Sequence, residues 1–440
     1  MFDSSCFSVR TYCLFLLLLL PAARVFSQRV EPVPVIEDGY VTRATSLADF
    51  DVNGFHVIRG KKTIFLTETA PHTGTTTKTA PYVGQAVTVY GELKKKGHQV
   101  IAENVLFRSV DKSTLSGFAL VDRIVSPAGP AADPLRLLLR ADGYLILINA
   151  TTKISFESPL TSLHDINANV WLKYHGVTQA DGFILADAAV FSPSTVTDSE
   201  AKLLEKNNYD PAAVDPDAKQ DLARELFLGI DPKMIPPYKD AAMQARIDRI
   251  GTSLIPAYQR SLPDSDKRKI PFKFQLIAAK WKDALTLPNG IILIPHQVIE
   301  RLQNDSQIAT LLADNMATAI EKQTYRISPA AHEMLAANLA STAAGIFVPG
   351  VGVATGVRAK SIHDDLLNQS GRVSLGLLHD AGYDITQAPV AWWLLAHNSP
   401  GDLSSVHIPP RAANLYKSLG TTWHNYTEAS IAPSATLQSN

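Results

Sequence analysis

VTVYGELKKKGHQVIAENVLF, at Val87–Phe107, is matched later in the chain by WLKYHGVTQADGFILADAAVF at Trp171–Phe191. Each stretch has an aromatic residue followed by a glycine, a second glycine six positions on, and an ending in Val-x-Phe or Val-Phe. The period-two alternation at the start of the first stretch is typical of a half-buried strand. Because repeated units with the same turn chemistry fold alike, the pattern predicts two tandem β modules, small and barrel-like in the manner of OB folds.

The two β modules are expected at 43–112 and 113–194, where short runs rich in Val, Ile, Tyr and Thr alternate with Gly, Pro and Asn. Lys94, Lys95 and Lys96 make a charged hairpin tip. We interpret the tip as a solvated loop, because no aromatic platform flanked by basic residues accompanies it. No nucleic-acid partner is therefore expected.

Length and charge restrict the class of protein. The 440 residues are 46% hydrophobic, which is enough apolar material for more than one folded core. The 41 Lys and Arg residues nearly balance the 42 Asp and Glu residues, so the formal charge is −1. Net charge therefore attracts the chain neither to nucleic acid nor to an acidic membrane.

The first residues, MFDSSCFSVRTYCLFLLLLLPAARVFSQ, predict a secretory signal peptide at 1–27. Arg10 precedes an apolar run from Cys13 to Leu20, and small residues follow. An uncleaved anchor is the alternative, but the run is shorter than the ~20 residues that span a bilayer. Both cysteines lie in this segment, so a mature chain starting at Gln28 would be exported, periplasmic or secreted, without a disulfide.

Composition sets the remaining boundaries. A Pro-rich lead-in at 28–42 is expected to be extended, and the polar stretch after Ser194, with its Asp-Pro turns, indicates a linker at 195–237 that is helical in part. A mainly helical domain follows at 238–422, and residues 423–440 are expected to form a disordered tail. The chain as a whole is therefore α+β and multidomain.

The helical domain should contain a small sheet. Two strand-like runs, Phe272–Ala278 and Gly290–Pro295, flank a Pro-Asn-Gly turn. Asn304 and Gln307 then form a capping-box pattern at the start of a helix. Four apolar residues recur at helical spacing and are expected to face a core: Ile308, Leu312, Met316 and Ile320.

The motifs of this domain resemble the HtpX and CAAX-prenyl-endopeptidase-type zinc metallopeptidases, the gluzincins of peptidase family forty-eight. LPNG at Leu287–Gly290 stands where these enzymes carry LPGG, and AGYD at Ala381–Asp384 stands where they carry A-G-Y-D. Arg372 takes the last position of their E-A-D-R motif, and His407 precedes prolines as in their terminal H-P stretch. The resemblance covers about Tyr238–Leu419 and implies a metallopeptidase-like fold there.

The resemblance also implies that the zinc chemistry is missing. TLLADNMATAIEKQ, at Thr310–Gln323, takes the place of a helix in which H-E-x-x-H binds zinc and its Glu activates water. The three motif positions are Asp314, Asn315 and Thr318 here, and the Glu ligand of E-A-D-R falls on Gln369. We therefore expect no catalytic residue, no cofactor, and a metal-free polar cluster in which these four side chains hydrogen-bond one another.

Two metal sites remain as alternatives. The four oxygen-bearing side chains would suit calcium or magnesium, although they include one carboxylate. His332, His363 and His379 each lack a histidine four residues on, but they would serve as zinc ligands if separate helices brought them together. Zinc would then be the cofactor of a working metalloendopeptidase with unconventional ligands.

The apolar segment Leu339–Val357 is long enough to raise the question of a membrane span. It is rich in Gly and Ala and has a central Pro349, so we expect a helical hairpin packed on the domain. The resemblance to membrane-attached peptidases keeps a peripheral membrane contact open.

Peptide binding needs no metal. In the family that the chain resembles, the strand before the zinc helix is the edge to which a substrate adds as a strand. The matching groove candidates are Gly290, Ile291, Ile292 and Leu293, with His407 beside them. We therefore expect an inactive peptidase homologue that binds a peptide or protein partner; the alternatives are a working metalloendopeptidase and a structural envelope protein.

Overall fold

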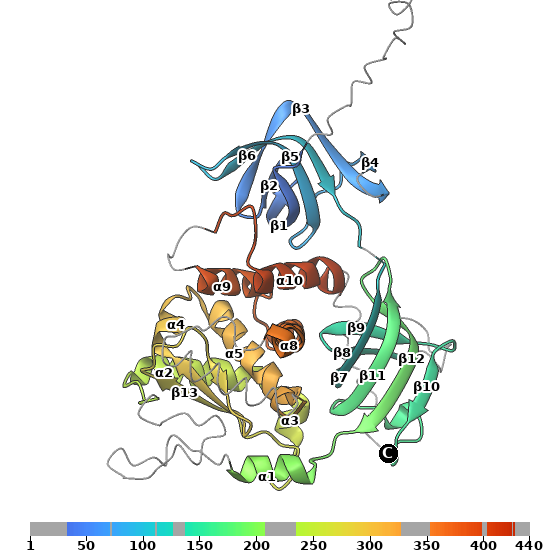
Figure 1. Ribbon diagram of the computed structural model, residues 1–440, viewed down its shortest axis with the longest axis vertical. Helices are drawn as coiled ribbons and strands as arrows, with labels where there is room; N and C mark the ends of the chain where they lie inside the picture. The colour runs from blue at the N-terminus through green and yellow to red at the C-terminus, as the bar shows by residue number, and fades with distance from the viewer. Residues whose placement is uncertain are drawn as a thin grey trace, which may run out of the picture.

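A computed structural model of the chain describes residues 33–70, 73–110, 112–125, 137–206, 235–326, 353–397, 403–424 and 426. The expected signal peptide, most of the linker, residues 339–352 of the apolar segment and most of the expected tail lie outside these ranges. The described chain is α+β, with two closed five-stranded barrels followed by a helical domain (Figure 1).

The first barrel closes through five strands and carries a short sixth strand at its edge: β1 (Ile36–Ser46), β2 (Asp49–Val52), β3 (Phe55–Ala70), β5 (Ala86–Lys94), β6 (Gln99–Phe107) and the added β4 (Thr73–Thr76). The order around the barrel is β1-β2-β3-β6-β5, and β5 pairs back with β1. The β3–β6 pair is parallel and the other pairs are antiparallel. Buried Phe50, Phe65 and Phe107 fill the centre.

The second barrel repeats this order with β7 (Thr114–Val125), β8 (Leu137–Ala141), β9 (Tyr144–Ile148), β11 (Val170–Thr178), β12 (Ile184–Pro193) and the added β10 (Lys153–Phe156). A short 3-10 helix, η1 (Leu163–Asp165), precedes β11. Here β9 and β12 form the parallel pair that closes the barrel. The expectation of two β modules of one kind is confirmed, and their strand order is consistent with OB-like barrels.

The repeated glycines explain why the two barrels share details. Gly97 and Gly182 adopt positive φ in the hairpin turns, as the repeat predicts. Gly91 and Gly176 lie at β-bulges within strands, not in turns. A Cβ at either position would overlap the main chain of the neighbouring strand, so the bulges require glycine.

The first barrel begins earlier than expected. Strand β1 starts at Ile36, inside the expected extended lead-in at 28–42, because Ile36 and Val41 are buried in the barrel core and pair with β5 or β2. The second barrel, expected at 113–194, runs from the start of β7 at Thr114 to the end of β12 at Pro193.

The helical domain holds a three-stranded sheet: β13 (Lys273–Ile277), β14 (Leu285–Thr286) and β15 (Ile291–Pro295). Its helices are α1 (Asp198–Lys206), α2 (Ala241–Leu254), α3 (Ala257–Ser261), α4 (His296–Glu300), α5 (Asp305–Ile320), α6 (Gln323–Arg326), α8 (Val353–Asp380), α9 (Gln387–Ala396) and α10 (Pro410–Ser418). A π-helical turn at Leu419–Trp423 follows α10.

Helix α5 lies in the centre of this domain. The Asn304 side chain caps it by accepting a hydrogen bond from the main-chain N–H of Gln307, as predicted. Ile308, Leu312 and Met316 are fully buried in the core shared by α2, α8, α9 and α10. The helix is buried on most sides, so its polar residues must find partners inside the protein.

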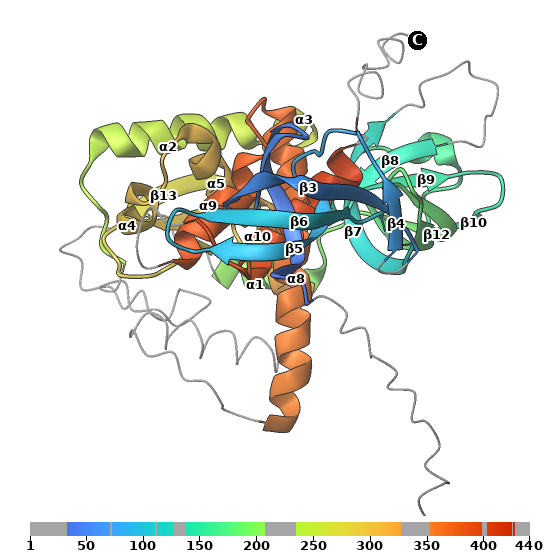
Figure 2. The ribbon, with the colours of Figure 1, turned by 90° about the horizontal axis from the view of Figure 1, so that it is seen from above.

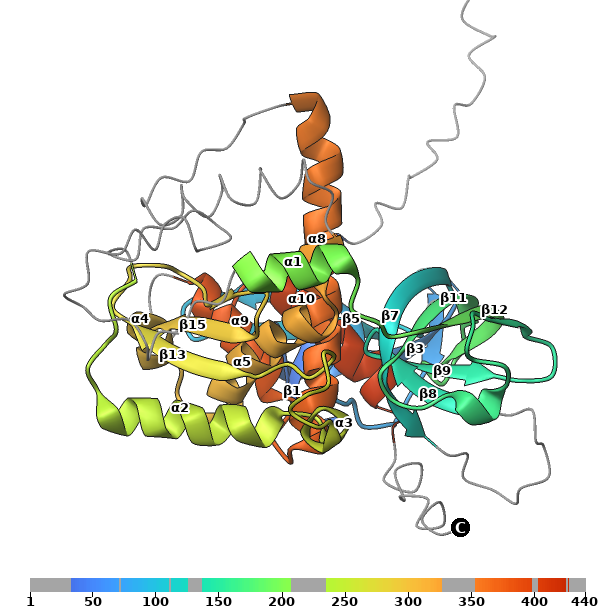
Figure 3. The same ribbon diagram turned by 90° about the horizontal axis from the view of Figure 1, so that it is seen from below.

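The three parts pack against one another. Figure 1 shows α9 and α10 between the first barrel and the rest of the helical domain, and the second barrel beside α8. Figures 2 and 3 show the N-terminal turns of α8 projecting beyond the body of the molecule. None of the helices in the described ranges is long and apolar enough to cross a membrane.

The first residues of the tail expected at 423–440 belong to the folded domain. Trp423 and Tyr426 are buried and pack against each other and against His379. Aromatic burial of this kind holds the chain against the domain core. The ordered domain therefore includes Tyr426.

Candidate functional site

Asp314 is the most constrained of the four positions, Asp314, Asn315, Thr318 and Gln369, at which the sequence resemblance places a zinc motif. It is 3% exposed on α5. One carboxylate oxygen accepts a hydrogen bond from the Ser370 hydroxyl of α8 at 3.2 Å, and the other accepts one from the Arg411 guanidinium of α10. A carboxylate at this depth requires such partners, since an unpaired buried charge is strongly unfavourable.

Arg411 joins three parts of the domain. Besides Asp314, it contacts Asp283, just before β14, at 3.0 Å. Its guanidinium lies 3.2 Å from the centre of the Trp392 ring on α9, a cation–π contact. A cation of the protein itself therefore balances the buried carboxylate of Asp314.

Asn315 and Thr318 are engaged within the domain. The Asn315 amide donates to the carbonyl of Leu311 at 2.9 Å and accepts from the Thr286 hydroxyl of β14 at 2.9 Å. The Thr318 hydroxyl donates to the main-chain carbonyl of Asp314 at 3.2 Å, a local helical contact. Both side chains use their polar atoms for structure.

Gln369 faces the second barrel. Its amide donates to the carbonyl of Phe118 on β7 at 3.2 Å, and its oxygen accepts from Gln323 at 3.3 Å. The expected cluster of mutually bonded side chains is therefore corrected. The nearest α8 partner of Asp314 is Ser370, one residue along the helix, because the two positions point to different sides of α8.

These side chains do not fit zinc. The one carboxylate is held by Ser370 and Arg411, and the neighbouring positions carry amides and a hydroxyl, which are weak zinc ligands. Burial raises the pKa of the Asp314 carboxyl to about 6, against the lowering effect of Arg411. No side chain at these four positions offers an ionised, unengaged carboxylate to activate water.

The expected peptide-binding edge is also corrected. Ile291, Ile292 and Leu293 belong to β15, which is the central strand of the sheet and is fully buried. It pairs with β13 on one side and with β14 on the other. Gly290 lies in the preceding turn at φ 87°. A peptide has no access to main-chain groups that β13 and β14 already use.

The open edge of the sheet is β14. The outer edge of β13 is already hydrogen-bonded. The segment at 236–238 pairs with the C-terminal end of β13, and the Gln244 side-chain amide bonds the main chain of Phe274 and Leu276. Directly after β14, the main-chain N–H of Leu287 donates to the carbonyl of Ile291. Because hydrogen-bonded and non-hydrogen-bonded pairs alternate along an antiparallel ladder, the preceding residue Thr286 directs its main-chain N–H and C=O away from β15. Within the described ranges, those two groups of Thr286 have no hydrogen-bond partner.

His407 belongs to another surface. It is exposed, and its segment packs on the turn between β2 and β3 of the first barrel. The Asn53 amide donates to the carbonyl of Val406 at 3.0 Å, and the N–H of Ser405 donates to the carbonyl of Asn53 at 3.1 Å. The segment that carries His407 therefore packs on the first barrel.

The three isolated histidines do not converge. His332 lies outside the described residues. His363 and His379 both lie on α8, and a helix rises about 1.5 Å per residue, so their Cα atoms are about 24 Å apart along it. This distance is too great for the two histidines to share one metal ion. Among the described residues, no three His, Cys, Asp or Glu side chains form a metal-binding group.

Buried ion pairs fix the second barrel to α8. Arg140, 1% exposed, bonds Asp122 at 2.9 Å and Asp380 at 2.6 Å. Arg372 of α8 bonds Asp142 of the second barrel at 2.5 Å, so it joins the two domains. Burial raises the pKa of Asp122 to about 6, whereas Arg140 and His379 lower that of Asp380 despite its burial.

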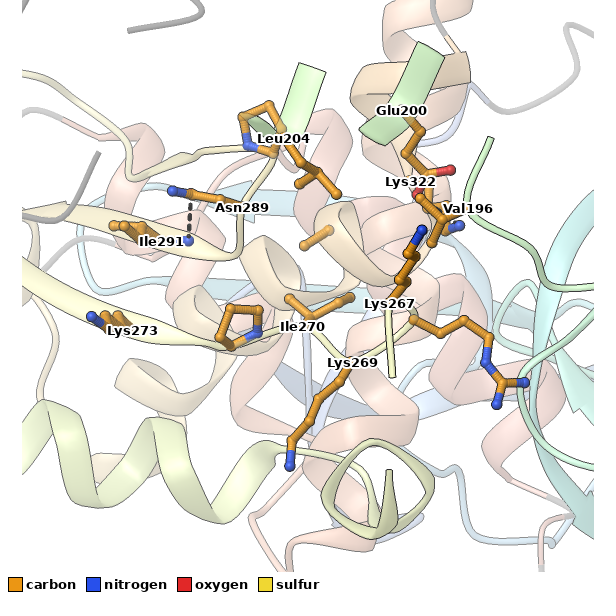
Figure 4. A pocket seen from close by; sticks show the side chains of 14 residues that line it. Val196, Glu200, Leu204, Lys267, Lys269, Ile270, Lys273, Asn289, Ile291 and Lys322 are labelled. Carbon is orange, nitrogen blue, oxygen red and sulfur yellow. Dashed lines mark hydrogen bonds and ion pairs between the residues drawn. The ribbon is translucent and has the colours of Figure 1, made fainter. Parts of the chain in front are cut away.

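A cavity of about 410 Å³ opens at one end of the sheet, between α1, the loop before β13 and the β14–β15 turn (Figure 4). Its apolar walls include Ile270, Pro288 and Ile291, together with Ala319 from the last turn of α5. Lys267 and Lys322 lie at the same opening. The sequence motif LPNG marks this turn, but nothing in the sequence signalled that α1 and the lysines meet it.

Comparison with known protein families and with curated proteins finds no match for this chain. Three residues that organise it, Arg411, Ser370 and Thr286, carry no motif of their own. Each is identified by its contact with a motif position on α5.

Proposed function

We propose that this protein is an exported, catalytically inactive homologue of zinc metalloendopeptidases, and that it binds an extended segment of a peptide or protein partner. The observation that carries the proposal is the engagement of the α5 motif positions. Asp314 is neutralised by Arg411 and Asn315 is bonded to Thr286, so the helix serves as a structural support for β14.

The binding edge in this proposal is β14. An extended peptide adds to a sheet edge through main-chain hydrogen bonds, and these require an N–H and a C=O that no neighbouring strand uses. Thr286 supplies both. Its hydroxyl is bonded to the side-chain and main-chain oxygens of Asn315, at 2.9 and 3.0 Å, which holds β14 in position on α5.

Binding and metal content test this proposal together. Fluorescein-labelled casein peptides are titrated with the purified chain in EDTA and followed by fluorescence anisotropy, and metal content is measured by plasma mass spectrometry. We expect saturable binding in EDTA, less than one equivalent of zinc in protein purified without EDTA, and no cleavage of the peptides in buffer that lacks EDTA. Cleavage that EDTA abolishes would identify a working metalloendopeptidase, whereas absence of binding would favour a structural protein.

A further inference from the structure

A cleft of about 780 Å³ lies where the first barrel, the second barrel and the C-terminal end of α10 meet. Figure 1 shows α10 directly below the first barrel, with the second barrel beside its end. The volume falls within the range of about 300–1,000 Å³ that is usual for small-molecule sites. A Cβ on Gly182 of the second barrel would overlap the carbonyl of Thr421, and a Cβ on Gly420 would overlap the carbonyl of Gly84 in the first barrel. Close main-chain packing therefore fixes the walls of the cleft.

The outer face of the first barrel forms one wall of the cleft. Val87 and Val89 of β5 point into the barrel core, so the alternate residues Thr88 and Tyr90 face outward and line the cleft. The antiparallel pairing of β1 with β5 places Tyr40 on the same outer surface. Strand alternation thus gives this wall both aromatic and hydrogen-bonding side chains.

Tyrosine is the aromatic residue of the cleft. Four of the described lining residues are tyrosines: Tyr40, Tyr82, Tyr90 and Tyr144. Tyr40 stacks on Tyr416 of α10 with 6.1 Å between the ring centres, and the Arg372 guanidinium lies 4.7 Å from the ring centre of Tyr144. Tyr90 has no ring partner among the described residues. Rings that the protein already orders lose little conformational freedom when a ligand packs on them.

The charges of the lining nearly balance. Among the described lining residues, the acids are Glu37, Asp38 and Glu68, and the bases are Arg108 and Lys417. Arg108 bonds Asp38 at 2.8 Å, and Glu68 accepts a hydrogen bond from a main-chain N–H at 3.3 Å. Glu37 and Lys417 are exposed and have no side-chain partner within the described ranges. The cleft therefore offers an anionic acceptor and a cationic donor, without a surplus of positive charge that would attract a polyanion.

This lining selects a neutral ligand with many hydroxyl groups. Ionised carboxylates accept hydrogen bonds from hydroxyl groups, and Lys and Arg donate to hydroxyl oxygens. The C–H groups on the face of a sugar ring pack on the electron-rich face of a tyrosine ring. An apolar ligand would leave the polar groups of the cleft without hydrogen bonds, and a nucleic-acid strand would meet three acids against two bases.

We propose that this cleft binds a short neutral oligosaccharide, with one sugar ring against Tyr90 and hydroxyl groups of the sugar chain toward Glu37 and Lys417. None of the described lining residues belongs to β14. The inference therefore does not rest on peptide binding at that edge.

A glycan array tests the class of ligand. The labelled full chain is applied to immobilised cello-, xylo-, manno- and chito-oligosaccharides, next to sulfated heparan fragments and oligothymidylate. We expect binding to at least one of the neutral series and none to the two polyanions. Absence of binding to every neutral series, or binding to a polyanion that is equal or stronger, would overturn the proposal.

Calorimetric titration with the neutral oligosaccharide that binds best tests the residues. Tyr90→Ala should weaken binding about tenfold, whereas Tyr90→Phe should retain most of the affinity, because the ring packs on the sugar and the hydroxyl does not. Glu37→Gln should weaken binding about fivefold, because a charge-assisted hydrogen bond becomes a neutral one.

Glu103→Gln is the matched control for Glu37→Gln. Glu103 is an exposed acid on β6 of the same barrel and is not among the described lining residues of the cleft. The control should bind the oligosaccharide as the wild type does, and thermal unfolding should confirm that each variant is folded. Equal loss in the control, or wild-type affinity of both Tyr90→Ala and Glu37→Gln, would place the sugar elsewhere and overturn the proposal.

Discussion

Arg411 on the first turn of α10 donates a hydrogen bond to the buried carboxylate of Asp314 on α5, although 97 residues separate the two in the chain. The guanidinium also stacks on Trp392 and reaches Asp283. A fixed positive charge therefore stands at the carboxylate that would begin a zinc site in the enzymes the sequence resembles. This contact explains how an acid is accommodated in the centre of an apolar helix.

Replacing Arg411 by alanine should destabilise the fold. The change leaves the Asp314 carboxylate with the Ser370 hydroxyl alone, and removing one partner of a mostly buried ion pair costs about 2–4 kcal/mol. Urea unfolding measures the loss. Asp314→Asn should cost less in the Arg411→Ala background than in the wild type, and additive effects would contradict the pairing.

The pH dependence of stability should report Asp314. Burial raises the pKa of its carboxyl to about 6, compared with about 4 in an unfolded chain. The folded protein therefore retains a proton that the unfolded chain has lost between these values, so stability falls as the pH rises through 6. From pH 7 to pH 5 this group should add about 1 kcal/mol to the free energy of unfolding.

Asp314→Asn isolates that contribution, because Asp122, whose pKa burial also raises to about 6, is unchanged in the variant. Urea unfolding at pH 5, 6 and 7 should show a shallower pH dependence for the variant than for the wild type. If the stability of the variant and of the wild type changed equally with pH, Asp314 would be ionised throughout this range. The effect of Arg411 on the pKa of Asp314 would then outweigh the effect of burial.

Gly143→Ala should loosen the second barrel from α8. Gly143 adopts φ 70°, and a Cβ there would overlap the backbone of Arg372. Gly97→Ala is the matched control, because Gly97 also has positive φ but has nothing within 4 Å of an added Cβ. Backbone strain alone should cost about 1–2 kcal/mol at Gly97, and the overlap should raise the loss at Gly143 to about 3 kcal/mol or more. Equal losses in thermal unfolding would exclude a close barrel–helix contact.

Rebuilding a zinc site should require the removal of Arg411. With Asp314→His, Asn315→Glu and Thr318→His in place, Arg411→Ala removes a cation that would repel the metal. Because Ser370 rather than Gln369 contacts Asp314, adding Ser370→Glu should give about one equivalent of zinc, and adding Gln369→Glu should give less. Plasma mass spectrometry after dialysis measures the zinc content of the two variants. More zinc in the Gln369→Glu form would mean that Gln369, and not Ser370, stands at the position of the third ligand.

The barrels were predictable because their signals are local. The paired glycines at Gly97 and Gly182 specify hairpin turns, and alternation in the flanking strands sets which residues enter the core. The early start of β1 was less predictable, since the Glu-Asp-Gly sequence after Ile36 resembles a turn and its strand character comes from pairing with β5.

The site was less predictable because long-range contacts define it. The sequence identifies the α5 positions but not Arg411, whose role depends on how α10 packs. It also misplaced the sheet edge, since β14 is Leu285–Thr286 alone and such a short strand has no periodic signal. The central position of β15 follows from that pairing.

The most direct test of the account is peptide binding by Thr286→Pro. Proline removes the outward N–H of Thr286 and leaves the bonds between β14 and β15 intact, because that N–H does not join the ladder. Thr286→Val is the control, since it loses the same hydroxyl contact with Asn315 and keeps the N–H. With labelled casein peptides in EDTA, we predict that the proline variant binds about tenfold more weakly than the valine variant, at equal unfolding free energy. Equal affinity of the two variants would contradict peptide addition at β14.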